Sequence, residues 1–207
     1  MKLIQGFGIG LVLLGLILYI IGLTYKSRDS WLDVRILTAS HHFLRRQPWV
    51  SIFRWLWPLG TTPTALGMLL LLAVYNLRLG LTTALVLVVI MTIENLIKRS
   101  HARPRPFQAL HGIHMLQPRQ PRDPSFPSGD ALRAWFLASL IPLALGAGYP
   151  LLQVVTLLVT GVLAALVSLG RIAMGVHYPS DVIGGAGLGL IASGAVLFIL
   201  PLHLVLI

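Results

Sequence analysis

The chain has 207 residues, of which 56% are hydrophobic and only 11% are charged, and its mean hydropathy is +0.84. Soluble domains carry about 25% charged residues, so the composition indicates an integral membrane protein. The absence of cysteine excludes disulfides and thiolate chemistry. The net charge of +10 fits topology signals, anionic lipid head groups or a phosphate ligand. Nucleic acid is not expected as a partner, because there is no soluble basic domain to bind it.

The apolar segments predict an all-α bundle of six membrane-spanning helices in a single domain, residues 1–207. A spanning helix needs about 20 mostly apolar residues, and such segments fall at 3–23, 60–77, 80–97, 131–147, 151–169 and 182–206. The first lacks a small-residue cleavage site, which indicates an anchor helix rather than a signal peptide. Six spans place both ends of the chain on one side of the membrane and loops one, three and five on the other.

The segment 24–58, between the first two predicted spans, mixes cations with aromatic side chains. It contains Lys26, Arg28, Arg35, Arg45, Arg46, Arg54, Trp31, Trp49, Trp55 and Trp57. This pattern predicts an amphipathic segment that lies in the membrane interface. An ordinary solvated loop is the alternative.

Basic residues gather on the side of the membrane that carries loops one, three and five. Of the 16 lysines and arginines, those on this side are Lys26, Arg28, Arg35, Arg45, Arg46, Arg54, Lys98, Arg99, Arg103, Arg105, Arg119, Arg122 and Arg171. Lys2 and Arg78 lie on the other side, and Arg133 lies within a span. The positive-inside rule alone would therefore place the charged face in the cytoplasm.

The stretch GRIAMGVHYPSD, residues 170–181, places three ionisable groups after a long apolar run. Such groups at membrane depth are costly and indicate function. His177 and Asp181 are four residues apart, so the carboxylate can hold one ring nitrogen and leave the other free as a nucleophile or base. A purely structural His–Asp pair is the alternative.

Two further stretches on the charged face fit an anion site. In PSGD, residues 127–130, Ser128 can cap the following helix, and Gly129 lets an anion approach the free backbone N–H groups of the helix end. In KRSHARPRP, residues 98–106, Lys98 and Arg105 supply fixed positive charge, with Glu94 one turn before the lysine. Taken alone, the first could be an ordinary helix cap and the second a cluster that binds acidic lipids.

The three stretches together resemble the signature of the type 2 phosphatidic acid phosphatase (PAP2) superfamily, the membrane lipid-phosphate phosphatases. That signature is Lys, six residues and Arg-Pro; Pro-Ser-Gly-His; and Ser-Arg, five residues, His, three residues and Asp. The matching residues are Lys98, Arg105, Pro106, Pro127, Ser128, Gly129, Arg171, His177 and Asp181. The resemblance covers residues 94–185, and the six-span layout with the motifs in the second and third loops of one face agrees with it.

The resemblance implies a role for each matching residue. His177 would attack phosphorus and form a phosphohistidine, and Asp181 would orient it. Phosphoryl oxygens would be held by Lys98, Arg105, Ser128, Gly129 and Arg171. The resemblance implies neither a metal nor another cofactor, and its partners would be the lipid substrate and the surrounding membrane lipids.

Asp130 is the major departure, because it replaces the histidine that the family uses to protonate the leaving oxygen; Gly170 in place of serine is a minor one. An ordinary Asp is ionised at neutral pH, and Arg133 on the same helix face would keep it so. A phosphomonoester needs a proton on its leaving alkoxide, whereas a diphosphate leaves as a weaker base. The sequence therefore favours a lipid diphosphate, such as undecaprenyl or another polyprenyl diphosphate.

Alternatives to a phosphatase remain open at this point. A phosphotransferase of the same family would pass the phosphoryl group to another lipid. A catalytically impaired relative would bind phospholipid or a protein, with Asp130 as its main support. A small transporter is disfavoured, because the ionisable residues gather at one end of the spans. The minimal loops fit a bacterial inner membrane, and the family resemblance implies a periplasmic site, against the charge count.

Overall fold

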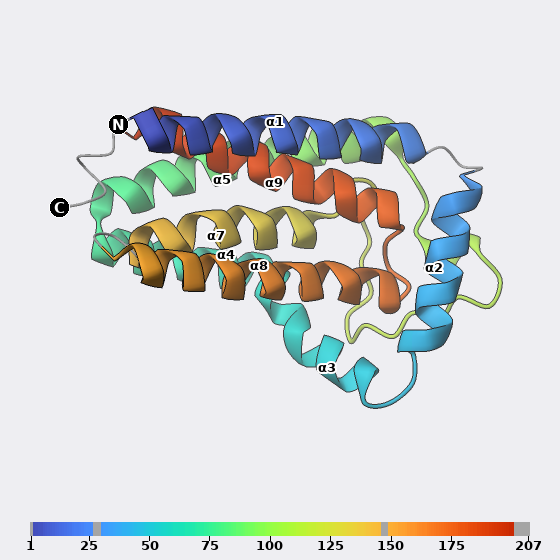
Figure 1. Ribbon diagram of the computed structural model, residues 1–207. Helices are drawn as coiled ribbons and strands as arrows, with labels where there is room; N and C mark the ends of the chain where they lie inside the picture. Colours follow the sequence, from blue (N-terminus) through green and yellow to red (C-terminus); the bar gives the residue numbers. More distant parts are fainter. Residues whose placement is uncertain (1, 27–29, 146–148, 201–207) are drawn as a thin grey trace.

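The computed structural model describes residues 2–26, 30–145 and 149–200, and the ordered elements within them are helical (Figure 1). The elements are α1 (Lys2–Tyr25), α2 (Trp31–Leu44), α3 (Trp49–Leu56), the 3-10 helix η1 (Trp57–Gly60), α4 (Thr62–Tyr75), α5 (Leu77–His101), α6 (Pro106–Ala109), α7 (Gly129–Leu145), α8 (Pro150–Ala173) and α9 (Pro179–Ile199).

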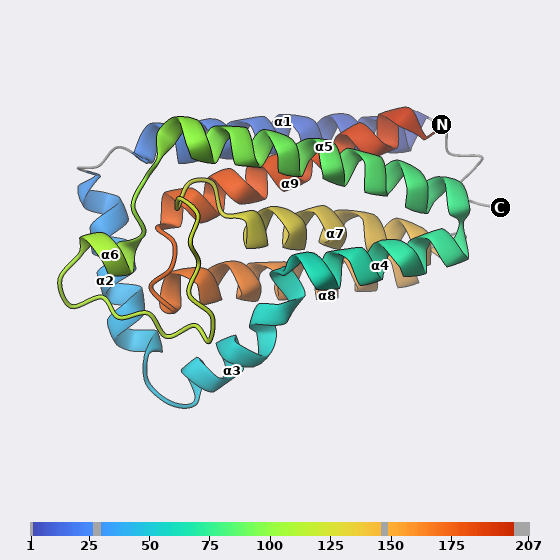
Figure 2. The same cartoon turned by 180° about the vertical axis from the view of Figure 1, so that it is seen from behind.

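The long helices α1, α4, α5, α7, α8 and α9 run side by side in one bundle (Figures 1 and 2). Helix α2 crosses one end of that bundle, and the loop between α6 and α7 folds over the same end. Helix α1 begins and α9 ends at the opposite end. The start of α7 and the α8–α9 connection therefore lie together at the end that α2 covers.

The predicted count of six spans is not confirmed by the described residues. Among the described residues, four helices are long and apolar enough to cross a membrane, namely α1, α5, α8 and α9. A fifth is counted if residues Trp49–Gly60 and Thr62–Tyr75, which meet at a 52° bend, act as one broken span. Helix α7 has 17 residues, and the ends of the predicted spans at 146–147 and 201–206 lie outside the described residues.

Local sequence signals explain where several helices begin. The Asn76 side chain accepts a hydrogen bond from the Leu79 backbone N–H at 3.0 Å and caps α5. Pro150 and Pro179 occupy the first positions of α8 and α9, where the fixed φ of proline suits a helix and its missing N–H is not needed. The starts of these three helices are thus fixed by residues at the helix ends themselves.

Glycines let α1 and α9 pack backbone against backbone. A Cβ atom on Gly15 would lie 2.6 Å from the Gly187 carbonyl oxygen, and one on Gly22 would lie 2.6 Å from the Gly184 nitrogen and 2.7 Å from the Ser180 carbonyl oxygen. Close approach of this kind favours association of helices in lipid. The first turn of α9, which carries Ser180, is therefore supported directly by α1.

The predicted interfacial segment folds as two short helices, α2 and α3, and Arg28 of that segment lies outside the described residues. Helix α2 buries one stripe against the bundle end, which consists of Asp33, Leu37, His41 and Leu44. Its other face exposes Trp31, Leu32, Ile36 and Phe43. One of the buried residues is a carboxylate, which needs a charged or hydrogen-bonding partner to be buried without a large penalty.

Candidate active site

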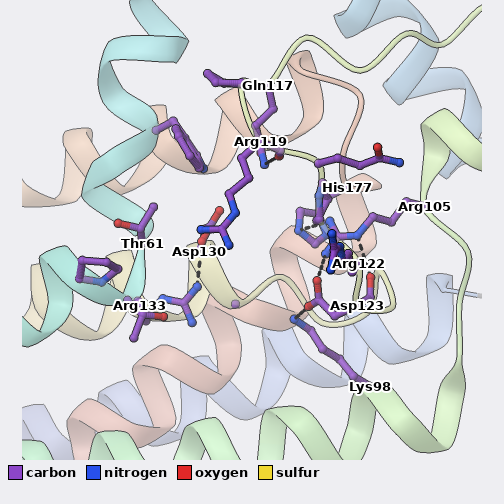
Figure 3. Close-up of a pocket in the computed structure, with 17 residues that line it drawn as sticks. Thr61, Lys98, Arg105, Gln117, Arg119, Arg122, Asp123, Asp130, Arg133 and His177 are labelled. Carbon is purple, nitrogen blue, oxygen red and sulfur yellow. Dashed lines mark hydrogen bonds and ion pairs between the residues drawn. The ribbon is translucent and has the colours of Figure 1, made fainter.

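A pocket of about 930 Å³ opens at the end of the bundle that α2 covers (Figure 3). It lies between the η1–α4 turn, the end of α5, the segment 117–123, the start of α7 and the α8–α9 connection. Its walls include Lys98, Arg105, Gly129, Asp130 and His177 of the predicted site. Ser128, Arg171 and Asp181 are buried directly behind these walls.

His177 lies in the α8–α9 connection, is only 4% exposed and faces the pocket. Its Nε2 is 3.1 Å from Nη1 of Arg105. Because a guanidinium can only donate, Nε2 accepts, and the ring hydrogen is on Nδ1. Burial, followed by the nearby charge of Arg105, lowers the pKa of His177 to about 4, against the opposing effect of Asp181. At neutral pH the ring is therefore neutral, and its Nε2 lone pair points at Arg105, which also lines the pocket.

Asp181 stands behind His177, with its Oδ2 3.6 Å from Nδ1 of the ring. The same carboxylate is fully buried and accepts hydrogen bonds from the Ser125 hydroxyl at 2.5 Å and the Tyr178 backbone N–H at 2.8 Å. Its other oxygen, Oδ1, binds Nη1 of Arg103 at 2.6 Å. The carboxylate is thus fixed on several sides and faces the nitrogen that carries the ring hydrogen.

Lys98 and Arg105 share a carboxylate that sequence analysis had not assigned. Asp123 binds Nζ of Lys98 at 2.5 Å and Nη2 of Arg105 at 2.9 Å. Although burial raises the pKa of Asp123, the two cations outweigh it and lower that pKa to about 2. Lys98 also pairs with Glu94 at 2.7 Å, as the spacing of these two residues predicted. The two cations thus already bind one anionic group, the Asp123 carboxylate, at the pocket wall.

Asp130 is clamped between two arginines (Figure 3 shows Arg133). Its Oδ1 is 2.8 Å from Nη2 of Arg133, and its Oδ2 is 2.8 Å from Nη1 of Arg171. Guanidinium groups donate only, so both carboxylate oxygens act as acceptors. The arrangement stabilises the ionised form of Asp130, which cannot donate a proton to a leaving group.

Arg171 is 1% exposed, and its Nε and Nη2 have no hydrogen-bond partner among the described residues. Buried guanidinium donors without partners are costly and mark a place for an acceptor. The free donors are on the same guanidinium group that binds Asp130 at the edge of the pocket. The oxygens of a phosphoryl group can accept the two parallel hydrogen bonds that Nε and Nη2 of one guanidinium donate.

Ser128 and Gly129 form the start of α7, as expected for a helix cap. The Ser128 hydroxyl oxygen is 3.5 Å from the Ala131 backbone nitrogen. The backbone N–H of Ser128 donates to the backbone carbonyl of Asp181 at 2.9 Å. Gly129 has a steric reason to be glycine, because a Cβ atom there would lie 2.2 Å from Oε1 of Glu94. Gly129 lines the pocket, while Ser128 joins the two motif loops behind it.

The structure therefore brings all eight predicted site residues to one end of the bundle. It also adds Arg103, Ser125 and Asp123, which contact predicted residues, and Asp33, which binds Arg103 and Ser180. The neighbours Arg103 and Asp123 lie in or beside the motif loops, but nothing in their local spacing indicates a role. Asp33 gave one signal, a carboxylate in a predominantly basic segment.

A buried histidine backed by a carboxylate lies beside a cation-lined pocket in a bundle of apolar helices, and these features fit the class of membrane phosphatases. Comparison with known proteins agrees. A family model described as the PAP2 superfamily matches residues 75–202. The chain therefore belongs to the PAP2 superfamily and is an enzyme of the lipid phosphatase class.

Two solved structures are similar over most of the chain. One is the transmembrane PAP2-type phosphatidylglycerolphosphate phosphatase from Bacillus subtilis, with a TM-score of 0.72 and 25% identity over 91% of this chain and 93% of that one. The other is LpxE from Aquifex aeolicus, with a TM-score of 0.69 and 23% identity over 84% of this chain and 99% of that one, which shows a shared fold. No curated protein matches the chain.

Proposed function

We propose that this enzyme removes the terminal phosphoryl group of a lipid phosphate or diphosphate through a phosphohistidine at His177, and that it favours a polyprenyl diphosphate such as undecaprenyl diphosphate. The observation that carries the proposal is the Nε2 lone pair of His177, which meets the Arg105 guanidinium at the wall of a cation-lined pocket. A phosphoryl group that binds Arg105 would come within reach of that lone pair.

In the first step, the Nε2 lone pair attacks phosphorus and the bond from phosphorus to the leaving oxygen breaks. The hydrogen on Nδ1 stays in place, so the ring gains positive charge that Asp181 stabilises from behind. Lys98, Arg105 and Arg171 neutralise the phosphoryl oxygens, with the Gly129 end of α7 beside them. In the second step, water attacks phosphorus and the N–P bond breaks, which returns the electron pair to Nε2; inorganic phosphate leaves with both hydrogens of the water, one on the new oxygen and one on another phosphoryl oxygen.

The clamp on Asp130 supports the preference for a diphosphate. An ionised Asp130 supplies no proton, so a leaving alkoxide would depart unassisted, whereas a leaving phosphate ester is a far weaker base. Arg119 and Arg122 also line the pocket, and Figure 3 shows the Arg119 side chain extending from the segment 117–123 towards Asp130. These two arginines would bind the second phosphate of a diphosphate and stabilise its charge as it leaves.

An apolar groove of about 250 Å³ supports a substrate with a long chain. The groove lies between α4, α7 and α8, and its walls include Leu59, Thr64, Ala138 and Ala164. Leu59 and Thr64 lie on either side of the residues 61–63 that line the polar pocket, so the groove and the pocket meet at the η1–α4 turn. A lipid could place its head group in one and its chain in the other.

The test is a substrate panel on purified enzyme that includes a polyprenyl diphosphate, its monophosphate and phosphatidic acid. The expected result is phosphate release from all active substrates through a His177 phosphoenzyme, with the highest kcat/KM for the diphosphate. Turnover of phosphatidic acid equal to or better than that of the diphosphate would contradict the preference. Turnover of every substrate by His177→Ala at the wild-type rate would contradict the mechanism.

A second candidate function is that of a catalytically impaired relative that binds phospholipid. Asp130 favours it, because this carboxylate already occupies Arg171, one of the cations that would hold phosphate. The two functions are separated by acid-free trapping of the phosphoenzyme from labelled diphosphate. Label on the peptide that contains His177 supports the phosphatase, and its absence with intact substrate binding supports the impaired relative.

We place the site on the periplasmic face of a bacterial inner membrane, with six spans and with α2 in the interface. Helix α7 and the bent α3–α4 unit would complete the count of six, and both belong to the bundle. The exposed Trp31, Ile36 and Phe43 of α2 suit contact with lipid at the head-group level. A reporter fused to the C-terminus tests the placement, since an outward-facing site requires cytoplasmic termini.

A further inference from the structure

A buried chain of alternating charges leads from α2 to the candidate nucleophile. Asp33 of α2 binds Nη2 of Arg103 at 2.7 Å, and Nη1 of the same guanidinium binds Asp181 at 2.6 Å. The exposed fractions of Asp33, Arg103 and Asp181 are 3%, 8% and 0%. Asp181 in turn faces Nδ1 of His177 at 3.6 Å. The order is carboxylate, guanidinium, carboxylate, imidazole.

Residues of the turn between His177 and Asp181 make further contacts with Asp33 and Arg103. Asp33 accepts hydrogen bonds from the Ser180 hydroxyl and, at 2.9 Å, from the Ser180 backbone N–H, one residue before Asp181. The Arg103 guanidinium carbon lies 3.9 Å from the centre of the Tyr178 ring, one residue after His177. Arg103 also donates to the Ser180 hydroxyl at 2.8 Å. Asp33 and Arg103 therefore hold both ends of the turn between His177 and Asp181.

We propose that Asp33 and Arg103 are positioning residues for phosphoryl transfer, and that α2 thereby supplies part of the active-site electrostatics. The inference rests on the proposed role of His177. Arg103 binds Oδ1 of Asp181, and Oδ2, which also accepts hydrogen bonds from the Ser125 hydroxyl and the Tyr178 N–H, is the oxygen that faces the imidazole. Asp33 occupies the second arm of Arg103, so that Arg103 orients Asp181 without cancelling all of its negative charge.

The physical reason for two carboxylates on one arginine is charge balance at a buried site. If Arg103 paired only with Asp181, it would neutralise the negative charge of Asp181, which stabilises the imidazole as the ring becomes positive during attack. If Arg103 paired only with Asp33, Asp181 would be a buried charge without a cationic partner, which is strongly unfavourable. The pair of carboxylates with one guanidinium leaves one net negative charge for the reacting ring.

This arrangement predicts opposite shifts of the pKa of His177 in two variants. The other charged groups that face the ring are Asp181 from α9, Arg105, Lys98 from α5 and Asp130 from α7, and neither variant removes any of them. Removing the positive Arg103 raises the pKa of His177, and removing the negative Asp33 lowers it. A purely structural role for the two residues would not give shifts of opposite sign.

The experiment measures the acid limb of kcat/KM from pH 3 to pH 8 for a polyprenyl diphosphate. We expect Arg103→Gln to move the midpoint up by about one pH unit and Asp33→Asn to move it down by about a third of a unit. Arg103→Lys keeps the charge but loses the second arm, so its midpoint should stay near that of the wild type while kcat falls about tenfold.

The matched control is Arg35→Gln. Arg35 lies on α2, as Asp33 does, but its guanidinium stacks on the exposed Trp31 at 4.8 Å and does not join the buried series of charges. This substitution removes the same charge as Arg103→Gln and should leave the midpoint and kcat unchanged. Equal shifts in Arg35→Gln and Arg103→Gln would overturn the proposal, because the effect would then be one of net charge.

A second measurement keeps the inference testable without turnover. Diethyl pyrocarbonate modifies neutral imidazole, and mass spectrometry of the peptide that contains His177 gives the pH midpoint of modification directly. Opposite shifts in Asp33→Asn and Arg103→Gln by this readout support the positioning role even if the wild type hydrolyses none of the chosen lipids, an outcome that would contradict only the proposed function. Unshifted midpoints in both folded variants would overturn the positioning role.

Discussion

The two walls of the pocket differ in how their charged groups are held. On the nucleophile wall, His177 and Asp181 are almost fully buried, and Asp181 has partners from several segments of the chain. On the opposite wall, Asp130 stands between two arginines, and exposed Arg119 and Arg122 reach in from the segment 117–123. The first wall keeps the family signature, and the second departs from it at the residue that would protonate the leaving group.

Under the proposed mechanism, this contrast separates the attack on phosphorus from the departure of the leaving group. Attack depends on a preorganised ring and fixed cations, both of which this chain has. Departure depends on the charge that the leaving group carries, and the chain offers cations where its relatives are expected to offer an acid. Changes on the nucleophile wall should therefore affect every substrate, and changes on the opposite wall should discriminate between substrates.

The largest effect is expected for His177→Ala. Loss of the nucleophile should lower kcat by about 10⁴-fold or more for monophosphate and diphosphate alike, and no phosphoenzyme should be trapped. Phosphate release is the measurement for each substrate. His111→Ala is the control, because His111 is exposed in the loop after α6. Residual activity that depends on substrate type would show that the two walls are not separate.

Arg171→Lys should have the next largest effect, about a 10²-fold loss of kcat/KM for all substrates. A lysine keeps the charge but cannot hold Asp130 and also offer the two donors that have no partner in the described residues. Steady-state kinetics on the substrate panel measure the loss. A loss confined to diphosphates would move Arg171 from the shared machinery to the leaving-group wall.

The pH dependence of kcat/KM should show an acid limb near pH 4. Because the pKa of His177 is lowered to about 4, the ring is neutral and nucleophilic above that pH and becomes protonated below it. Activity should therefore be level between about pH 5 and neutrality and fall about tenfold for each pH unit below the limb. Rate measurements at fixed low substrate test this. A limb near 6.5, the ordinary value for histidine, would mean that the ring is not shielded as the structure indicates.

Asp130→His should sharpen the contrast by restoring an acid to the leaving-group wall. We expect about a tenfold gain in kcat/KM for phosphatidic acid and little change for a polyprenyl diphosphate. Asp130→Asn is the control, because it also releases Arg171 and Arg133 but supplies no acid. An equal gain in both variants would show that release of Arg171, rather than protonation, limits the wild type.

Asp123→Asn is expected to have the smallest effect. Asp123 is partly exposed and pairs with Lys98 and Arg105, so an anionic substrate must displace it. Removing its charge should lower KM by about two- to threefold and leave kcat unchanged, because pairs with an exposed member are worth little. Asp123→Glu, which keeps the charge, should retain the wild-type KM. A fall in kcat would mean that Asp123 takes part in a later step.

Sequence reasoning predicted what is local in the chain. The partners Glu94 and Lys98, and likewise His177 and Asp181, are four residues apart, so helical or turn geometry brings them together. Arg133 was expected to hold Asp130 ionised, and it lies 2.8 Å away. The apolar segments likewise predicted the positions of the long helices and the end of the bundle that carries the motifs.

Sequence reasoning missed contacts that depend on how distant segments fold together. Asp33 and Arg103 are 70 residues apart, and Asp130 and Arg171 are 41 apart, so no spacing rule connects them. The count of spans was also less certain than hydropathy indicated, because α4 has only 14 residues and meets η1 at a bend. An apolar segment predicts a helix, but its neighbours determine where that helix bends and stops.

The close packing of Gly22 against the first turn of α9 has a consequence for the smallest working unit of this enzyme. The segment that matches the family begins at residue 75, yet Gly22 and Asp33 lie upstream of it and touch Ser180. A truncated version that starts at the matched segment would keep every signature residue and lose the scaffold beneath the catalytic turn. The first two helices therefore pack directly on the turn that carries the proposed nucleophile, beyond any role as an anchor.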